Sequence, residues 1–447
     1  MSFIVKRFTN SKIQTALLLL AVFLCYTAMY AIRKSFLAGQ YTGLRLGYGL
    51  DAKTMLVISQ VLGYMVSKFV GIKVISEMRK ERRTYWLIGL VGFGLLMLGL
   101  FAVVPPAIKW VMLFLNGIPL GMVFGIVFSY IEGRKNTELL AAALSATFIF
   151  STGLVKTVGL MLMDYYNVSE YDMPFWTGLL FFPLFLVSVI VLNKIKGPDE
   201  RDVEQRTKRV PMYRQDRRRF LLQNGWGYAG LVVIYILLTI IRDVRDNFIV
   251  EFWSEQGLGG TPQIVTLTEI PVAIVVLVVA AAGIWIRSNS KAFSIGMMLM
   301  AAGAVLVIVS TYLFDRSVLS PVGWMILSGI GTYLPYILFH CLIFERLVAL
   351  LQFKGNVGFL FYLADALGYL GSVVILLLKE VIGFKQSWTR FFITIDIQCA
   401  VGILLLAGFV LWYFDRRIIR KHRYVAPPAS YNFYNNNINN NKDAQKV

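Results

Sequence analysis

Residues 26–36 read YTAMYAIRKSF and lie in the C-terminal half of the first long apolar segment. An arginine there is unfavourable, because placing a charge deep in a bilayer costs about 3 kcal/mol or more. Tyr26, Tyr30 and Arg33 are spaced i, i+4 and i+7, which places them on one helical face. We expect this face to line a protein interior. The alternative is that Arg33 extends to the membrane surface, since the preceding apolar run is already long enough to span.

The composition indicates a polytopic membrane protein, with 57% hydrophobic and 15% charged residues among 447. The net charge of +19 does not indicate nucleic-acid binding, because the basic residues cluster in short loops between apolar segments. Cys25, Cys341 and Cys399 are scattered within apolar segments and suggest neither disulfides nor a metal site. The basic N-terminus lacks a small-residue cleavage site after its apolar run, so we expect a retained first span.

Twelve segments are long enough to cross a bilayer, which takes about 20 residues. They are residues 14–36, 53–76, 84–104, 107–130, 139–163, 172–193, 225–249, 263–286, 292–314, 321–344, 355–378 and 388–414. We therefore predict an all-α integral membrane protein with six-helix bundles at 1–193 and 225–425 and a basic cytoplasmic linker at 194–224. The Asn-rich residues 426–447 have no apolar periodicity, and we expect them to be disordered.

Charged residues in the loops predict the orientation. Even-numbered loops and the segment after the last span carry the bases, among them Arg79, Lys80, Arg82, Arg83, Arg134, Lys135, Arg287, Lys291, Arg346, Lys354, Arg416 and Arg417. Odd-numbered loops hold acids such as Asp164 and Glu170. The positive-inside rule then places both termini in the cytoplasm, and we expect a plasma (inner) membrane protein.

The two halves share a pattern. Tyr26, Arg33 and Lys34 have counterparts at one constant offset in Tyr235, Arg242 and Asp243, so each half presents Tyr-x6-Arg late in its first helix. Transporters of this size often consist of two repeated halves with a binding site at mid-membrane between them. The repeat predicts such a site.

Further polar residues lie inside the apolar segments. Tyr64 and Lys68 share a helical face, as do Asp365, Tyr369 and Ser372, while Ser151 precedes Lys156 by little more than a turn. The remaining candidates are Arg245, Asp246, Glu269 and Asp396. Intramembrane acids either pair with basic residues or relay protons. For Arg245, the alternative is a self-neutralising cluster with its neighbours in the same helix. We interpret His340 as a packed polar residue.

Interior cations outnumber the acids, which favours an anionic ligand in a low-dielectric cavity. Two arginines on opposite halves suit a phosphate or carboxylate, because the planar guanidinium donates parallel hydrogen bonds. Gly117, Gly121 and Gly125 recur every four residues and predict close helix packing, and Pro119, Pro271 and Pro335 mark possible kinks. We find no Walker A loop, HExxH or Ser/His/Asp arrangement, so we expect neither an enzyme nor a cofactor.

The run from Tyr26 to Phe36 resembles the first helix of the organophosphate:phosphate antiporters of the major facilitator superfamily, the glycerol-3-phosphate and hexose-phosphate transporters. Tyr64-x-x-Ser67-Lys68-Phe69 resembles the same family's second helix, and Gly368-Tyr369-Leu370-Gly371 a run in its helix eleven. Arg242 resembles the family's arginine in helix seven, which clamps substrate phosphate together with the first arginine. The resemblance covers roughly the first 80 residues well and later residues in patches.

The chain also departs from the family pattern. Ser151 falls near the position of the family's helix-five histidine, a role that Lys156 could fill instead. Asp243-Val244-Arg245 replaces Tyr-Gly after the second arginine, and residues 71–77 are a degenerate form of the superfamily's Gly-x-x-x-Asp-Arg signature. These differences weaken the expectation of an identical substrate but not that of the fold.

The resemblance implies a twelve-helix major facilitator protein that exchanges an organophosphate, such as a sugar phosphate, for inorganic phosphate. The expected substrate-binding residues are Arg33, Arg242, Lys34, Lys68, Tyr26, Tyr30, Tyr64, Tyr369, Ser151 and Lys156, and the expected coupling or gating residues are Asp243, Arg245, Asp365 and Glu269. The alternatives are a proton-coupled symporter of a carboxylate or other anion, and a sensor that binds a ligand without transport. We expect a monomer in a lipid bilayer whose partner is a small anion.

Overall fold

The computed structural model describes residues 11–44, 51–76, 78, 80–131, 137–195, 214–283, 286, 288–351, 357–381 and 387–416. Every regular element in these ranges is a helix. The long helices are α2 (Ser11–Lys34), α3 (Ala52–Ser76), α4 (Arg83–Val103), α5 (Lys109–Ile131), α6 (Thr137–Tyr166), α7 (Met173–Lys194), α9 (Arg214–Glu255), α10 (Gln263–Ala282), α11 (Asn289–Asp315), α12 (Pro321–Leu338), α14 (Val357–Val381) and α15 (Trp388–Phe414).

Eleven helical stretches of the described chain are long and apolar enough to cross a membrane. One of them, Pro321–Leu350, runs through α12, a π-helical turn η6 (Phe339–Ile343) and the short α13 (Phe344–Leu350). Helix α14, with 25 residues, is the twelfth long element of the described chain. The expectation of an all-α membrane protein is confirmed.

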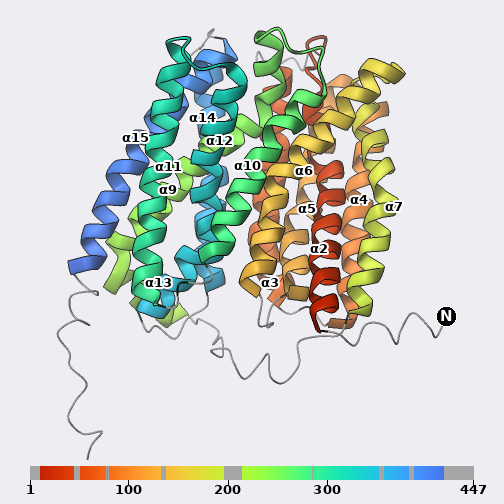
Figure 1. The fold of residues 1–447 in the computed structure, drawn as a ribbon. Helices are drawn as coiled ribbons and strands as arrows, with labels where there is room; N and C mark the ends of the chain where they lie inside the picture. The colour runs from red at the N-terminus through yellow and green to blue at the C-terminus, as the bar shows by residue number, and fades with distance from the viewer. Residues whose placement is uncertain are drawn as a thin grey trace, which may run out of the picture.

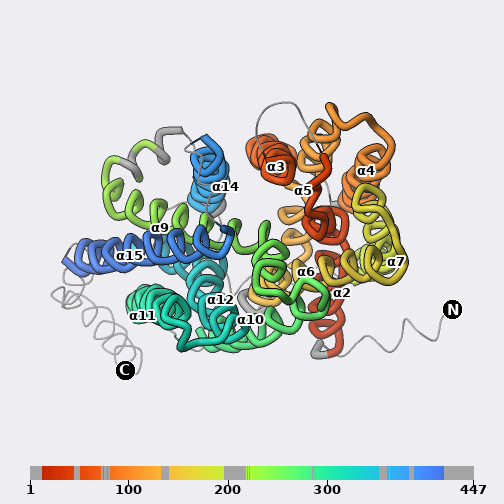
Figure 2. The backbone as a smooth tube through the Cα atoms, turned by 90° about the horizontal axis from the view of Figure 1, so that it is seen from above, coloured from red at the N-terminus to blue at the C-terminus, as the bar shows by residue number. Residues whose placement is uncertain are grey.

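The helices form two bundles, α2–α7 and α9–α15, which lie side by side in Figures 1 and 2. The bundles meet where α3 packs on α14 and α6 packs on α10. Helix α2 begins and α15 ends on the same side of the molecule, the lower side in Figure 1. We call this the near side and the opposite one the far side.

Helix α9 departs most from its predicted bounds. It begins at Arg214, within the segment predicted as linker, because its first turns are polar and hydropathy cannot detect them as helix. It continues to Glu255 through a kink at Phe248 (φ −124°, ψ 19°), whose ring stacks on Trp388 with centroids 3.9 Å apart. The rest of that linker, residues 196–213, and the predicted disordered tail, 426–447, lie outside the described residues. So do Arg79, Arg134, Lys135, Arg287, Lys354 and Arg417 among the bases used to predict the orientation.

Glycines bring α3 and α5 into backbone contact, as the four-residue repeat predicted. A Cβ atom on Gly117 would lie 2.3 Å from the Gln60 carbonyl oxygen, and one on Gly63 would lie 2.1 Å from the Phe114 carbonyl oxygen. A Cβ on Gly121 would lie 2.6 Å from the Ser67 Cβ. This contact fixes α3, and with it Tyr64 and Lys68, against the rest of its bundle.

We expect Gly117→Ala to lower the free energy of unfolding by about 1–3 kcal/mol, because the added methyl group must push two backbones apart. Thermal unfolding of the purified protein in detergent measures the effect. The matched control is Gly92→Ala in α4, where nothing lies within 4 Å of an added Cβ. Equal midpoints for the two variants would contradict the packing argument.

Candidate functional site

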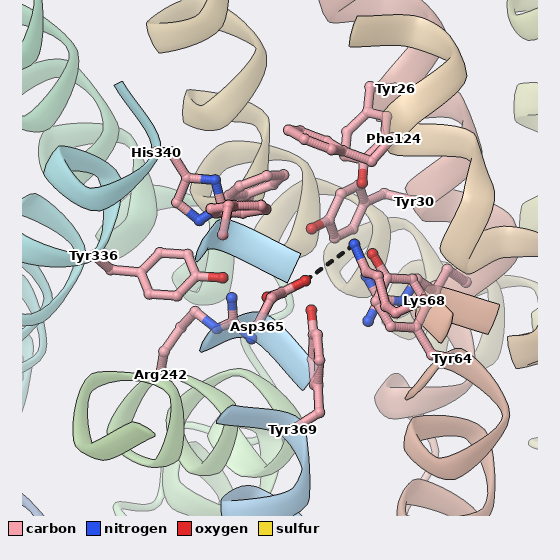
Figure 3. Close-up of a pocket in the computed structure, with 13 residues that line it drawn as sticks. Tyr26, Tyr30, Tyr64, Lys68, Phe124, Arg242, Tyr336, His340, Asp365 and Tyr369 are labelled. Atoms are coloured by element: carbon pink, nitrogen blue, oxygen red, sulfur yellow. Dashed lines mark ion pairs between the residues drawn. The ribbon is translucent and has the colours of Figure 1, made fainter. Parts of the chain in front are cut away.

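A small cavity lies between the two bundles (Figure 3). Its free volume of about 20 Å³ is room for about one water molecule. The described residues that line it are Tyr26, Tyr30, Arg33, Tyr64, Lys68, Phe124 and Phe148 from the first bundle, and Arg242, Tyr336, His340, Phe361, Asp365 and Tyr369 from the second. Eight of these were predicted as site residues from the sequence.

Arg33 lies at the end of α2 and is 3% exposed, so the alternative that it extends to the membrane surface is wrong. Its guanidinium carbon lies 3.6 Å from the centroid of the Tyr64 ring, a cation–π contact, and 5.8 Å from that of Tyr30. Its Nε has no hydrogen-bond partner, and no carboxylate of the described residues makes an ion pair with it. Arg33 is therefore a buried cation that faces the cavity without a counter-ion.

Arg242 approaches the cavity from α9 in the second bundle. Its guanidinium carbon lies 4.2 Å from the centroid of Tyr336, and its Nη2 donates to Asp243 Oδ1 at 2.6 Å. The repeated arginines thus line one cavity from opposite bundles, each resting on a tyrosine ring. Their repeated tyrosines differ, because Tyr26 lines the cavity whereas Tyr235 donates to Asp365 Oδ1 at 2.9 Å.

Lys68 and Asp365 form an ion pair across the interface, with Nζ and Oδ2 3.0 Å apart (Figure 3). The Lys68 Nζ also lies 4.9 Å from the centroid of Tyr64. On the other side of Asp365, Tyr235 lies within hydrogen-bond distance of His340 Nε2, at 3.3 Å. His340, which we interpreted as a packed polar residue, lines the cavity as well as packing.

Lys34 and Lys156 share a single carboxylate. The Nζ atoms of Lys34 and Lys156 lie 2.8 Å and 2.6 Å from the two oxygens of Asp246, which is one turn beyond Arg242 in α9. Lys34 also donates to Asn247 at 2.8 Å, and Lys156 to the backbone carbonyl of Asp246. Neither lysine is among the residues that line the cavity. Both instead join the two bundles on the far side of the cavity.

The remaining predicted residues bond elsewhere. Ser151 exchanges a hydrogen bond with Thr27 at 2.8 Å within the first bundle. Arg245 donates to Glu269 at 2.8 Å within the second, so it is buried in an ion pair between α9 and α10 rather than balanced by its neighbours in α9. Asp243 does neutralise Arg242 within the same helix. Asp396 is buried in α15.

The bundles are also joined farther toward the far side. Thr157 of α6 exchanges a hydrogen bond with Thr266 of α10 at 2.6 Å, and Lys53 of α3 is paired with Glu251 of α9. Tyr165 of α6 accepts from Gln263 at 3.3 Å. Together with the Asp246 cluster, these contacts close the far side of the cavity.

Besides His340, sequence reasoning missed four residues that line the cavity: Phe124, Phe148, Tyr336 and Phe361. The three phenylalanines lie in apolar segments, where nothing in the residue type marks a cavity. Tyr336 had a usable signal, because it lies four residues before His340 on the same helical face.

The arrangement of two six-helix bundles around a central cavity is that of the major facilitator fold. The chain is similar to a solved structure of a mutant nucleoside transporter NupG, at 14% identity and TM-score 0.54, over 89% of this chain and all of that one. It is also similar to a D-xylose-proton symporter, at 15% identity and TM-score 0.54, over 90% of this chain and 97% of that one. The protein is therefore an integral membrane protein of the major facilitator fold.

Within that fold, the chain belongs to DUF5690, described as a family of unknown function, whose profile matches residues 35–417. No curated protein sequence matches the chain.

We expect Asp246→Asn to lower the free energy of unfolding by about 3–5 kcal/mol, because it leaves two buried lysines without a carboxylate. The matched control is Asp315→Asn, which breaks an ion pair with Arg390, a side chain that is 63% exposed. That variant should lose about 0–1 kcal/mol. Thermal midpoints in detergent test the difference, and a control as destabilised as Asp246→Asn would contradict the role of the shared carboxylate.

Proposed function

We propose that the protein is a secondary transporter of a small organic anion that works by alternating access. The observation that carries the proposal is the surplus of positive charge at the buried cavity. Arg33, Lys68 and Arg242 line it, with Asp365 as the one carboxylate among the described lining residues and Asp243 bound to Arg242. An anion would supply the missing counter-charge in a low-dielectric site, where charge pairing is strong.

The two arginines are the proposed clamp for the anionic group. Arg33 carries an unpartnered Nε, and Arg242 lies opposite on the second bundle. Guanidinium groups donate parallel hydrogen bonds that match a phosphate or a carboxylate. The anion would take over the place of Asp243 on Arg242, and Tyr64 and Tyr336 hold the guanidiniums beneath it. The first candidate is an organophosphate exchanged for inorganic phosphate, which the motifs around Arg33 and Lys68 favour.

Alternating access would open the cavity to each side in turn. Room for about one water molecule excludes an organic anion until the bundles separate. If the near side is cytoplasmic, as the loop charges predict, the contacts at Asp246, Glu251 and Thr266 close the outer side. Transport then requires these ion pairs to break and the bundles to rock about the cavity.

A proton-coupled symporter is the second candidate, and the surroundings of Asp365 favour it. This carboxylate pairs with Lys68 across the interface, accepts from Tyr235, and belongs to a network that includes His340. Protonation of Asp365 would weaken the cross-bundle pair, which is how a proton could be linked to opening.

We expect proteoliposomes preloaded with inorganic phosphate to exchange it for labelled phosphate, and organic phosphates to compete. Arg33→Lys and Arg242→Lys should each reduce exchange more than tenfold, because a lysine cannot donate two parallel hydrogen bonds to the anion. Losing about 1.4 kcal/mol of stabilisation corresponds to a tenfold lower rate. The matched control is Arg390→Lys, an exposed arginine far from the cavity. No exchange by folded protein would contradict the antiport proposal, and binding without flux would indicate a sensor.

The two coupling schemes are separated by a pH gradient. For the antiporter, an imposed gradient drives no uptake of labelled anion without phosphate on the opposite side, and Asp365→Asn impairs exchange at every pH. For the symporter, the gradient drives uptake and Asp365→Asn abolishes that response. Uptake of radiolabelled anion into pH-jumped proteoliposomes distinguishes them.

A further inference from the structure

The lining of the cavity has an unusual composition. Each of the thirteen described lining residues is either charged or carries a ring. Four are charged, and the other nine are tyrosine, phenylalanine or histidine. Among these thirteen there is no amide side chain and no serine or threonine, so the neutral hydroxyls of the lining are all phenols, on Tyr26, Tyr30, Tyr64, Tyr336 and Tyr369.

The rings without a hydroxyl gather in one part of the cavity, which we call the aromatic end and define as Phe124, Phe148, His340 and Phe361. The ring centroid of His340 lies 5.3 Å from that of Phe148 and 4.5 Å from that of Phe361, and Phe124 lies 5.7 Å from Phe148. Figure 3 shows His340 and Phe124 at one end of the site and Arg242 and Tyr369 toward the other. The site therefore has an aromatic end and an end that holds the two arginines, and Lys68 lies between them, with its Nζ 5.6 Å from the centroid of Phe124.

The aromatic end is built from both bundles. Phe124 and Phe148 belong to α5 and α6, whereas His340 and Phe361 belong to η6 and α14. The contacts of His340 with Phe148 and Phe124 therefore cross the interface. When the bundles separate, the ring contacts across the interface break. A flat group could then enter between these rings and make the same edge and face contacts with them.

The hydroxyls of a sugar would be poorly matched at the aromatic end, where three of the four rings are the phenyl groups of Phe124, Phe148 and Phe361. Against phenyl rings they would lose water without gaining a hydrogen-bond partner, which is unfavourable for each buried group. An aromatic ring loses no such bonds and gains ring contacts as well as burial.

We propose that the substrate is an aryl anion, a phosphate or carboxylate attached to a flat aromatic ring. Its anionic group would lie between Arg33 and Arg242, and its ring would enter the aromatic end. This inference rests on the proposed function, since it takes the cavity as the substrate site, and it narrows the class from organic anions in general to aromatic ones.

The test is ligand-dependent thermal stabilisation of the purified full-length protein, which requires no transport. The probes are phenyl phosphate, cyclohexyl phosphate, glycerol 3-phosphate and inorganic phosphate. We expect half-maximal stabilisation at about tenfold lower concentration for phenyl phosphate than for glycerol 3-phosphate. Cyclohexyl phosphate, equally apolar but not flat, should bind more weakly than phenyl phosphate.

A pair of variants on α6 locates the effect. Phe148→Leu should reduce the preference for phenyl phosphate over glycerol 3-phosphate by about tenfold, because it removes a ring from the aromatic end. The matched control is Phe150→Leu, two residues away, whose ring packs on Phe23 with centroids 5.8 Å apart. This control should leave the preference unchanged.

Three outcomes would overturn the inference. The first two are that glycerol 3-phosphate binds as tightly as phenyl phosphate, and that no probe stabilises the protein. The third is that Phe148→Leu weakens the binding of all probes equally, which is expected if the rings only seal the cavity. Preferential binding of phenyl phosphate without counterflow would contradict transport but leave the aromatic site standing. Counterflow in which glycerol 3-phosphate competes best would support transport but contradict the aromatic site.

Discussion

The pairing of buried charges across the interface is the constraint on which the structure depends. Lys34 and Lys156 meet Asp246, and Lys68 meets Asp365, in each case from opposite bundles. A charge buried without a partner is strongly destabilising, so each bundle is incomplete until the other supplies its counter-ions. Arg33 is the exception, and a tyrosine ring takes the place of a carboxylate beneath it.

Much of the fold could be predicted, because hydropathy reports directly which segments prefer a bilayer to water. The first two helices of the first half and the first helix of the second half were also informative about the site, since Arg33, Lys68 and Arg242 are unfavourable in a membrane unless they face a partner or a cavity. The sequence does not record which acid meets which base. Lys34 and Lys156 were therefore placed in the binding site, although a carboxylate from the other bundle holds them outside the cavity. For the same reason Phe124 and Phe148 were not predicted, because the sequence does not distinguish a phenylalanine that faces a cavity from one that faces lipid.

Local backbone features help to position the second half of the site. The π-helical turn at Phe339–Ile343 contains His340, one turn after Tyr336, and π-turns of this kind are frequent at functional sites. Beyond the cavity, α9 continues past the kink at Phe248 to Glu251, which pairs with Lys53. One helix thus carries the arginine at the cavity, the carboxylate shared by two lysines and part of the far-side closure. Movement of α9 would therefore affect all three at once.

The sharing of Asp246 by two lysines has an electrical consequence. Two cations against one carboxylate leave a fixed positive charge within the membrane-spanning part of the molecule, and Arg33 adds another. A membrane voltage acts on such charges with about 2.3 kcal/mol per elementary charge for each 100 mV crossed. Any rearrangement that moves them through the field is therefore voltage-dependent, and the proposed anion, if it travels with them, would reduce that dependence. Under the proposed alternating access, the resting potential of the membrane would help to set which face of the protein is open.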